Sequence, residues 1–512
     1  MRSDQQQAIN RLAGTSATAF LCAVLCVYPL YIDKFSNLGV TKFTGCFTLF
    51  LLFLLWLVAC TAIGARAPRP RNANAGRDVT LWGVLAFAGT SLISTFTSLS
   101  PTASTWGLGG YYGGLMLVLF TAAGYWAVRS YLDLENLDFV FWVLGITTSI
   151  VAVLYVLNIF NIDLIGAYAD TAVVERAQFF STLGQKDFNG CFFSVALPIV
   201  FYQFLNAKDT RTAVWTGIPA AFGALALAVV DSEALALGIG AAVMVLVCHK
   251  NFTTRHLRRA ALISAAFFGW AAWMHYMRAS VYTQGGTALL AKLGAWQVAL
   301  PCMAASLLLW LVLFVLARKG IAAQAPLYLP GRVITIAVLA VGALAFVLAN
   351  AMPNRPLPES LHNLLVFNDD WGTYRGVAWR AAFGTWADGS LLRKIVGIGP
   401  GMMHTAVAAW AGDAMTARMA TFYAAHNEYL EQLLTTGILG LTAWLLLVAA
   451  HLQRGERSWN TPGVAPVMLA LCSYLAQAVV SIRVSMVFPL VMLLFGALAA
   501  LTAPELPQPA AP

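Results

Sequence analysis

The chain has 512 residues, of which 60% are hydrophobic and 10% are charged, and its net charge is +9. Soluble domains carry about 25% charged residues, so this composition excludes a soluble enzyme, a disordered chain and a small disulfide-stapled module. It indicates an all-α polytopic membrane protein, because each spanning helix needs about 20 apolar residues. The basic excess is typical of cytoplasmic loops, so nucleic-acid binding is not expected.

The apolar runs predict fourteen candidate spans. Their limits are 14–32, 42–64, 78–98, 112–130, 138–160, 187–206, 213–230, 234–249, 260–276, 297–317, 333–350, 429–450, 464–481 and 485–503. The pair between 213 and 249 is short for two crossings, so we expect 12–14 transmembrane helices. With the N-terminus inside, short loops hold 18 basic residues on the cytoplasmic side and 7 outside, which supports that orientation. The tail after the last span is expected to be disordered.

Two outer segments stand out, at about 161–186 and 351–427. The second is too long for a simple connector, and loops of this length are usually functional or disordered. It is rich in Trp and Tyr rather than low in complexity. We therefore expect one large extracytoplasmic loop of short helices.

Residues 372–402 of this loop read GTYRGVAWRAAFGTWADGSLLRKIVGIGPGM. Arg375 and Arg380 lie near the start of a stretch whose apolar residues, Val377, Trp379, Phe383 and Trp386, have the spacing of an interfacial helix. The two arginines either reach lipid headgroups or form a clamp for phosphate oxygens. The GIGPGM run predicts a tight turn and not a dinucleotide site.

His426 directly precedes the span at 429–450. Asn427 suits the N-cap and Glu428 the first turn of that helix. A helix start disfavours protonated histidine, and a neutral imidazole there is a usable general base. The alternative is a histidine at headgroup level with no role.

The other outer loop offers Arg176, Gln185, Lys186, Asp187 and Asn189 at the mouth of the sixth span, although such residues also serve as ordinary interfacial anchors. Asp231, Ser232 and Glu233 are either functional acids near the membrane or a hairpin tip at its outer face.

No metal or other cofactor is predicted. The outer histidines and acids, which are His362, His404, His426, Asp369 and Asp370, lack the spacing of metal ligands.

Four of these patterns, taken in order, resemble the O-antigen ligase and polymerase superfamily of bacterial envelope glycosyltransferases. They are ERAQFFSTLGQKDFNG, RGVAWR, GIGPGM and AHNEYLEQLLTTGILGL, and the resemblance covers roughly residues 170–450. One departure is Glu233, which stands where the family often has an arginine. A second diphosphate contact is therefore expected from Arg176 or Arg380.

The resemblance implies a GT-C-like, metal-independent, inverting transferase in the bacterial cytoplasmic membrane, with its active site on the outer side. The implied donor is a glycan on undecaprenyl diphosphate, and the acceptor hydroxyl belongs to a lipid A core sugar, a growing glycan or a protein side chain. Membrane lipids are its other expected partners. The family's essential histidine and loop arginine correspond to His426 and Arg375, the predicted catalytic residues. The predicted substrate-binding residues are Arg176, Arg380, Lys186, Asn189, Asn427 and Tyr429.

The sequence is accordingly divided into N-terminal helices (1–165), a catalytic core that includes the outer loop (166–455), and a C-terminal hairpin with its tail (456–512). Three other functions stay open: a polymerase of the same superfamily, a lipid-linked glycan flippase or transporter, and a scaffold for envelope assembly.

Overall fold

The computed structural model describes residues 2–63, 78–230, 232–280, 293–321, 324–352, 357–410 and 423–503. These ranges are helical and contain no strand, only isolated bridges between Phe180 and Gly184 and between Thr253 and Pro326. The predicted disordered tail, Asp231 and parts of the 351–427 loop lie outside the described residues.

Each predicted span coincides with a helix. These helices are α1 (Arg2–Cys22), α2 (Leu38–Ile63), α3 (Val79–Phe96), α5 (Leu115–Tyr131), α6 (Leu137–Ile159), α7 (Lys186–Asn206), α8 (Thr210–Val229), α9 (Glu233–Cys248), α10 (Thr254–Ser280), α12 (Trp296–Arg318), α13 (Tyr328–Ala351), α19 (Glu428–Arg457), α20 (Val464–Gln477) and α21 (Phe488–Leu501). Within the described ranges, nine helical stretches are long and apolar enough to cross a membrane, and α9, α20 and α21 are shorter apolar helices. The prediction of an all-α polytopic membrane protein is confirmed.

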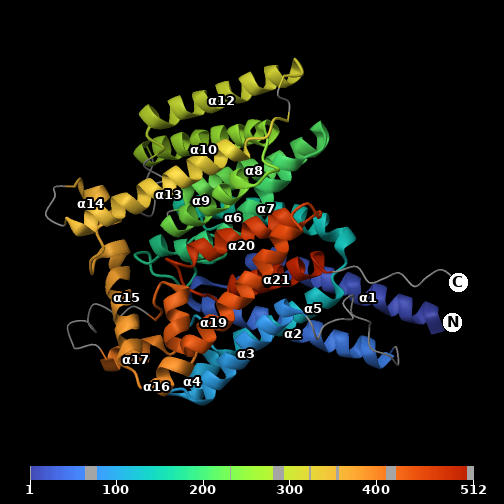
Figure 1. Ribbon diagram of the computed structural model, residues 1–512, viewed down its shortest axis with the longest axis vertical. Helices are drawn as coiled ribbons and strands as arrows, with labels where there is room; N and C mark the ends of the chain where they lie inside the picture. Colours follow the sequence, from blue (N-terminus) through green and yellow to red (C-terminus); the bar gives the residue numbers. More distant parts are fainter. Residues whose placement is uncertain are drawn as a thin grey trace.

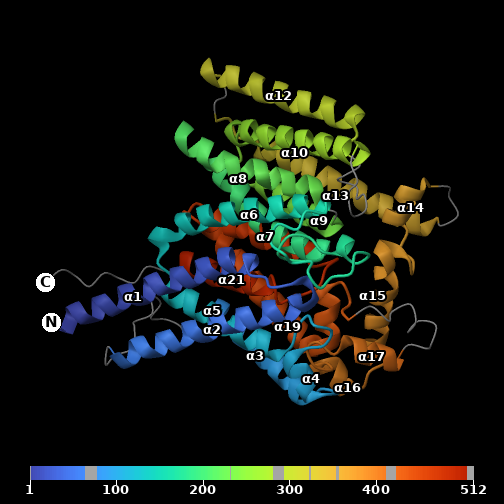
Figure 2. The ribbon, with the colours of Figure 1, turned by 180° about the vertical axis from the view of Figure 1, so that it is seen from behind.

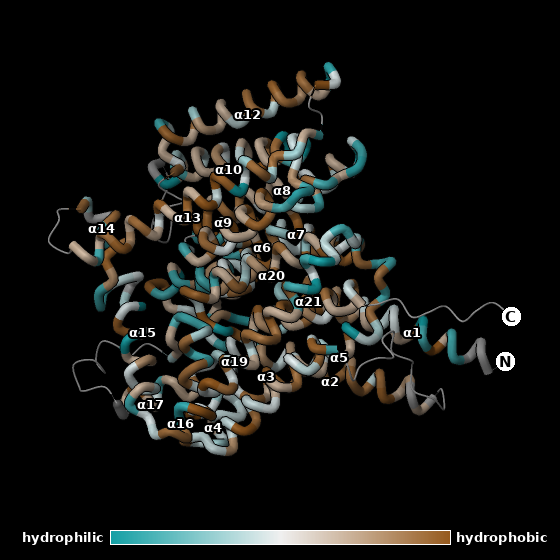
Figure 3. The backbone as a smooth tube through the Cα atoms, viewed as in Figure 1, coloured by the Kyte–Doolittle hydropathy of each residue, from teal (hydrophilic) through white to brown (hydrophobic). Residues whose placement is uncertain are grey.

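The spanning helices run side by side, while the described part of the long outer loop gathers at one end of the bundle (Figures 1 and 2). That part forms α14 (Glu359–Leu365), α15 (Trp371–Ala387), α16 (Leu391–Val396) and α17 (Met403–Trp410), beside α4 (Pro101–Trp106) from another loop. The start of α1 lies at the opposite end. We call the α14–α17 end the outer end, following the orientation predicted from charge. Figure 3 shows long apolar stretches along the spanning helices.

The helix α12 lies at the edge of the bundle against α10, and α13 packs on α9; only 6% of the apolar window of each is buried. In a membrane the exposed faces of these two helices contact lipid, because an apolar face without a protein neighbour has lipid tails as its partners.

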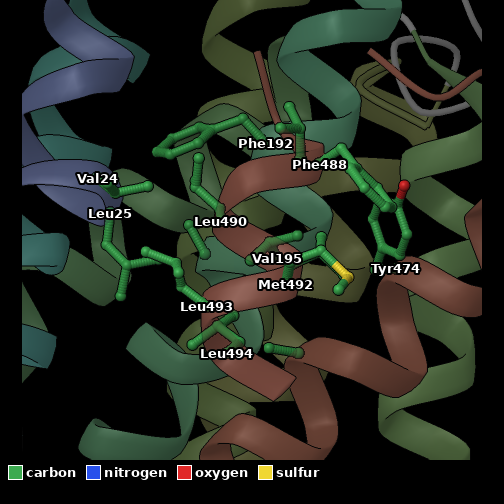
Figure 4. Close-up of a cluster of buried hydrophobic side chains, with 14 of the residues drawn as sticks. Val24, Leu25, Phe192, Val195, Tyr474, Phe488, Leu490, Met492, Leu493 and Leu494 are labelled. Atoms are coloured by element: carbon green, nitrogen blue, oxygen red, sulfur yellow. The ribbon is translucent and has the colours of Figure 1, made fainter. Parts of the chain in front are cut away.

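The centre of the bundle is built around α20 and α21. Every residue of α21 is buried, and Figure 4 shows Leu490, Met492, Leu493 and Leu494 from this helix packed among side chains of other helices. α21 packs on α5, and α20 packs on α7 and α9. The three predicted sequence divisions therefore share one core.

Residues 478–487 join α20 to α21 without helical structure, and most of them are buried. We call this segment the connector. Non-helical backbone inside a membrane protein needs polar partners within the protein. Three of its carbonyls find partners outside the segment: Glu428 N donates to Ala478 O at 2.9 Å, Arg375 Nε donates to Val480 O at 3.0 Å, and the Tyr28 hydroxyl donates to Ser485 O at 2.8 Å.

The outer segment has a small core of its own, which confirms that the described part of the long loop folds as short helices. α15 buries Val377, Ala378, Ala381 and Ala382 against residues that include Met403 of α17 and Leu434 of α19. The helix expected here is present as α15, and the side chain of Phe383 on it is 51% exposed. The alanines pack inward because small side chains allow close contact with α17 and α19. Figure 1 shows α15 lying across the ends of the spanning helices.

Candidate functional site

The GIGPGM turn is built against a break in α19. Gly437 has a non-helical backbone (φ 68°, ψ −171°) inside this helix, which leaves nearby carbonyls without helical partners. Ile398 N donates to Leu434 O at 3.2 Å, and Gly399 N donates to Thr435 O at 2.9 Å. The glycine turn and the Thr-Gly motif of the helix therefore complete each other's hydrogen bonds.

Positive φ explains the glycines of this turn. Gly397, Gly399 and Gly401 have φ of 81°, 106° and 71°, values that glycine tolerates best. A Cβ on Gly397 would lie 2.2 Å from Thr435 O. The motif brings two segments of backbone into contact at the outer end.

His426 lies just before α19 in an unusual backbone conformation. Its φ is 50°, a left-handed value that costs a non-glycine residue on the order of 1–3 kcal/mol. The surrounding contacts hold it there. Trp379 Nε1 donates to His426 O at 3.4 Å, and Ala425 N donates to Glu431 Oε2 at 2.7 Å. Such strain is often found at functional sites.

Asn427 caps α19 as predicted. Its Oδ1 accepts hydrogen bonds from Tyr429 N and Leu430 N, both at 3.0 Å. The Tyr429 hydroxyl donates to Leu475 O at 2.8 Å. Both side chains therefore help fix the start of α19, on which the position of His426 depends.

The surroundings of His426 favour its neutral imidazole. Burial lowers its pKa to about 4, the positive charge of Arg375 acts in the same direction, and Asp187 opposes them. At neutral pH the side chain can therefore accept a proton. The charges of Arg375 on α15 and Asp187 on α7 therefore act on His426 from two different helices.

Arg375 ties the outer segment to the connector. Its Nε donates to Val480 O at 3.0 Å, and its Nη1 donates to Gly372 O at 2.7 Å. The neighbouring residue Tyr374 has a positive φ of 69°. The guanidinium is therefore positioned by backbone carbonyls and has no carboxylate paired with it in the described structure, which leaves its charge available for an anion.

A second arginine, Arg483 of the connector, belongs to the same end of the bundle. Its Nη2 donates to Gln432 Oε1 at 3.0 Å, and its Nε lies 3.7 Å from Glu428 Oε2. The guanidinium also lies over Phe488, 4.5 Å from the ring centre. The other oxygen of Glu428 accepts a hydrogen bond from the Tyr474 hydroxyl.

The sequence did not predict Arg483, and it assigned Glu428 only to the first turn of a helix. A signal was available, since Arg483 is the one charged residue between residues 464 and 503. An ionisable residue inside an apolar stretch is a functional candidate by default. It was overlooked because it lies between two predicted spans, where arginine is ordinary.

Arg380 and Arg176, two other predicted binding residues, contact residues outside this cluster. Arg380 is 54% exposed and is paired with Asp369. Arg176 stacks over Tyr168 at 5.4 Å, and Lys186 is exposed at the start of α7. Their roles toward a substrate stay predictions.

Asn189 is fully buried. Its Nδ2 donates to the carbonyls of Phe180, Gly184 and Gln185, and its Oδ1 accepts from the Ser181 hydroxyl. These contacts favour a role in closing the 180–185 turn over one in holding substrate.

Ser232 and Glu233 of the DSE stretch lie between the end of α8 and the first turn of α9. Ser232 is buried and its hydroxyl donates to Asp187 Oδ1 at 2.9 Å, while Glu233 is exposed at the start of α9. This stretch therefore contributes Ser232, which orients Asp187 beside the candidate base.

Across the residues that the structure covers, no group of three or more His, Cys, Asp or Glu side chains is arranged to hold a metal ion. Comparison with protein-family models and with curated proteins gives no match to this chain.

Proposed function

We propose that this protein is a glycosyltransferase that moves a glycan from a polyprenyl diphosphate carrier to an acceptor hydroxyl. The reaction takes place at the outer face of the bacterial cytoplasmic membrane, as in the O-antigen ligases that the sequence resembles. One observation carries the proposal: the half-buried His426, whose pKa is lowered to about 4 by burial and by the Arg375 charge, shares the outer end of the bundle with that guanidinium, which is held by backbone carbonyls. A proton acceptor next to an anion-binding group is what this transfer requires.

In the proposed reaction, His426 accepts the proton of the acceptor hydroxyl while its oxygen forms a bond to the anomeric carbon of the donor. The bond from that carbon to the diphosphate oxygen breaks, and the diphosphate leaves with the electron pair. Arg375 stabilises the charge that develops on the leaving group. Attack from the opposite face inverts the anomeric centre.

Asp187 has a place in this scheme. Its charge favours the protonated form of His426, so it stabilises the imidazolium that exists after proton transfer. Ser232 fixes the orientation of Asp187 through its hydrogen bond.

The proposal is tested with purified protein in vesicles, a labelled polyprenyl-diphosphate glycan and a crude envelope acceptor fraction. Free polyprenyl diphosphate and product size are followed for wild type, His426→Ala and, as a control, His362→Ala. His362 lies in α14 at the same end of the bundle. We expect acceptor-dependent release that falls about 10²–10⁴-fold in His426→Ala and is unchanged in His362→Ala.

The size of the product separates the open alternatives. A single shift in size means a ligase, and a ladder means a polymerase of the same superfamily. Label that crosses the bilayer without release of polyprenyl diphosphate would show a flippase and would reject the proposed transfer. Release that persists in His426→Ala would reject the base assignment.

A further inference from the structure

A group of basic side chains gathers at the end of the bundle opposite the outer end, which we call the inner end. The short loop between α12 and α13 meets the start of α10 there, since Thr254 N donates to Ala325 O at 3.0 Å. From this loop α13 runs to α14 of the outer end. The members of the group come from the start of α10 and the end of α12, and they are Arg255, Arg258, Arg259, Arg318 and Lys319. We call them the inner basic group.

The inner basic group has no countercharge in its own part of the chain. Residues 234–358, which include most of α9 and all of α10, α12 and α13, contain ten Lys and Arg but no Asp or Glu. In the neighbouring loop between α7 and α8, Asp209 accepts hydrogen bonds from Thr212. Within the part of the chain that the structure describes, none of the five basic side chains forms an ion pair. Anions from outside the protein must therefore balance this charge.

Two arginines of the group are occupied by backbone carbonyls. Arg259 Nη1 donates to Phe204 O at 3.0 Å and to Ala207 O at 2.7 Å. Arg255 donates to the same Ala207 carbonyl. These carbonyls lie at the end of α7, where a positive charge is favourable. The role of Arg255 and Arg259 is therefore to close the end of that helix.

Arg258 and Arg318 are held differently. Their guanidinium groups lie over the same ring, that of Phe314, at 6.0 Å and 5.2 Å from its centre. Neither makes a hydrogen bond or an ion pair to the residues that the structure describes. The ring therefore gathers two like charges, one from α10 and one from α12, whose N–H groups are open to an acceptor. Guanidinium groups bind phosphate oxygens through forked, charge-assisted hydrogen bonds.

An exposed apolar face continues from these arginines along α12. Leu307, Leu311, Phe314 and Arg318 have the spacing of one helix face, and both leucines are exposed. Figure 3 shows that α12 is mainly apolar along its length. Two cations at the end of an apolar face fit a molecule that has an anionic headgroup and hydrocarbon tails. A free phosphate or a nucleic acid would use the cations and leave the apolar face unused.

We propose that Arg258 and Arg318 bind the phosphate of an anionic phospholipid in the leaflet at the inner end, with an acyl chain along Leu311 and Leu307. Basic pockets between spanning helices on the cytoplasmic side are suited to anionic headgroups. Such a lipid joins α12 to α10, the helix on which α12 packs. The inference does not depend on the proposed transfer reaction.

The test measures lipid binding directly. Full-length protein is exchanged into lipid-free detergent and titrated with dioleoyl-phosphatidylglycerol, and native mass spectrometry gives the affinity of each successive lipid. We expect one phosphatidylglycerol to bind wild type about 25-fold more tightly than dioleoyl-phosphatidylcholine does, because each basic side chain contributes about fivefold at an anionic lipid. In Arg258→Gln/Arg318→Gln this preference should disappear.

The matched control is Lys208→Gln/Arg211→Gln. These two residues are exposed on either side of Asp209, and the change removes the same charge from the inner end. It should leave the tightly bound phosphatidylglycerol in place. The melting temperature of each variant without lipid checks its folding, and the comparison of the two lipids in wild type needs no variant.

Three outcomes would overturn the inference. Equal affinity of wild type for the two lipids would mean that the apolar face alone binds lipid. An equal loss of phosphatidylglycerol in the control pair would mean that the basic residues act only as a diffuse charge. Displacement of phosphatidylglycerol by inorganic phosphate would assign the two arginines to a soluble anion.

Discussion

The two ends of α19 both bury charged residues, but they treat them differently. At the inner end, Asp78 accepts hydrogen bonds from Arg129 and Arg454 and also from Thr80. At the outer end, Glu428 and Arg483 lie 3.7 Å apart, and one atom of each makes no hydrogen bond. The inner cluster is a completed network and the outer one is not.

The pKa of Asp78 reflects this completeness. Burial acts to raise it, but the hydrogen bonds from Thr80 and Arg129 and the charge of Arg454 outweigh burial, so the pKa lies below its usual value. This network joins the start of α3 to the ends of α5 and α19. Buried charges with every partner in place rigidify a fold, whereas buried charges with open positions indicate a site that a ligand completes.

Removing the centre of the inner cluster should give the largest effect on stability. Asp78→Ala leaves Arg129, which is 1% exposed, buried without its carboxylate. Breaking a buried pair from one side costs about 3–5 kcal/mol. Thermal unfolding in detergent measures this as a large fall in melting temperature.

The matched variant at the outer end is Glu428→Gln. It keeps an acceptor for the Tyr474 hydroxyl, and Arg483 keeps its bond to Gln432. We expect a loss of less than about 1 kcal/mol. Equal destabilisation at the two ends would remove the distinction between a structural and a functional cluster.

Substituting the break in α19 should have an intermediate effect. Gly437→Ala places a side chain at a φ of 68°, with its Cβ 2.2 Å from Ile395 O. The strain costs on the order of 1–3 kcal/mol, and the displaced glycine turn should reduce transfer as well. Unfolding and activity are measured together on the purified protein.

Gly240→Ala serves as the control, because a Cβ on Gly240 of α9 meets no atom within 4 Å. This change should leave stability the same or raise it by up to about 1 kcal/mol, since alanine favours helix. If Gly437→Ala behaves like Gly240→Ala, the break is not needed for the site.

The helices could be predicted from the sequence because lipid imposes a simple rule, about 20 apolar residues for each crossing. All fourteen predicted spans coincide with helices for this reason. Asn427 was recognisable as a cap from local chemistry, and the structure shows that capping is what its side chain does.

The full site could not be read from the sequence, because it depends on long-range contacts. Arg483 meets Glu428 and Gln432 only because α20 and α21 fold back against α19. The polar run at 174–190 likewise led to Asn189 as a predicted binding residue and offered Asp187 only as one of its polar groups, but it is the charge of Asp187 that acts on His426. Asn189 turned out to be enclosed by its own loop.

Changing the candidate anion contact should reduce transfer more modestly than removing the base. Arg375→Ala loses the charge and its two backbone contacts, and we expect kcat/KM for the donor to fall about 10- to 100-fold. Arg375→Lys restores the charge but not the forked geometry, so it should recover only part of the loss. Full activity in the lysine variant would show that no forked contact exists.

The smallest expected effect is on pH dependence, and it tests the outer end most directly. His426 must be unprotonated to act as a base, and burial with the Arg375 charge lowers its pKa to about 4. The acid limb of kcat/KM reports the base in the free enzyme. We therefore expect kcat/KM to be flat from about pH 7 to pH 5 and to fall tenfold per pH unit below about pH 4, with activity recovered on return to pH 7. Removing the guanidinium in Arg375→Ala should move that limb upward, since one of the two causes of the low pKa is gone. A limb near the ordinary histidine value of about 6.5 in wild type would mean that the base is exposed. His426 would then be a histidine at headgroup level and not part of an enclosed site.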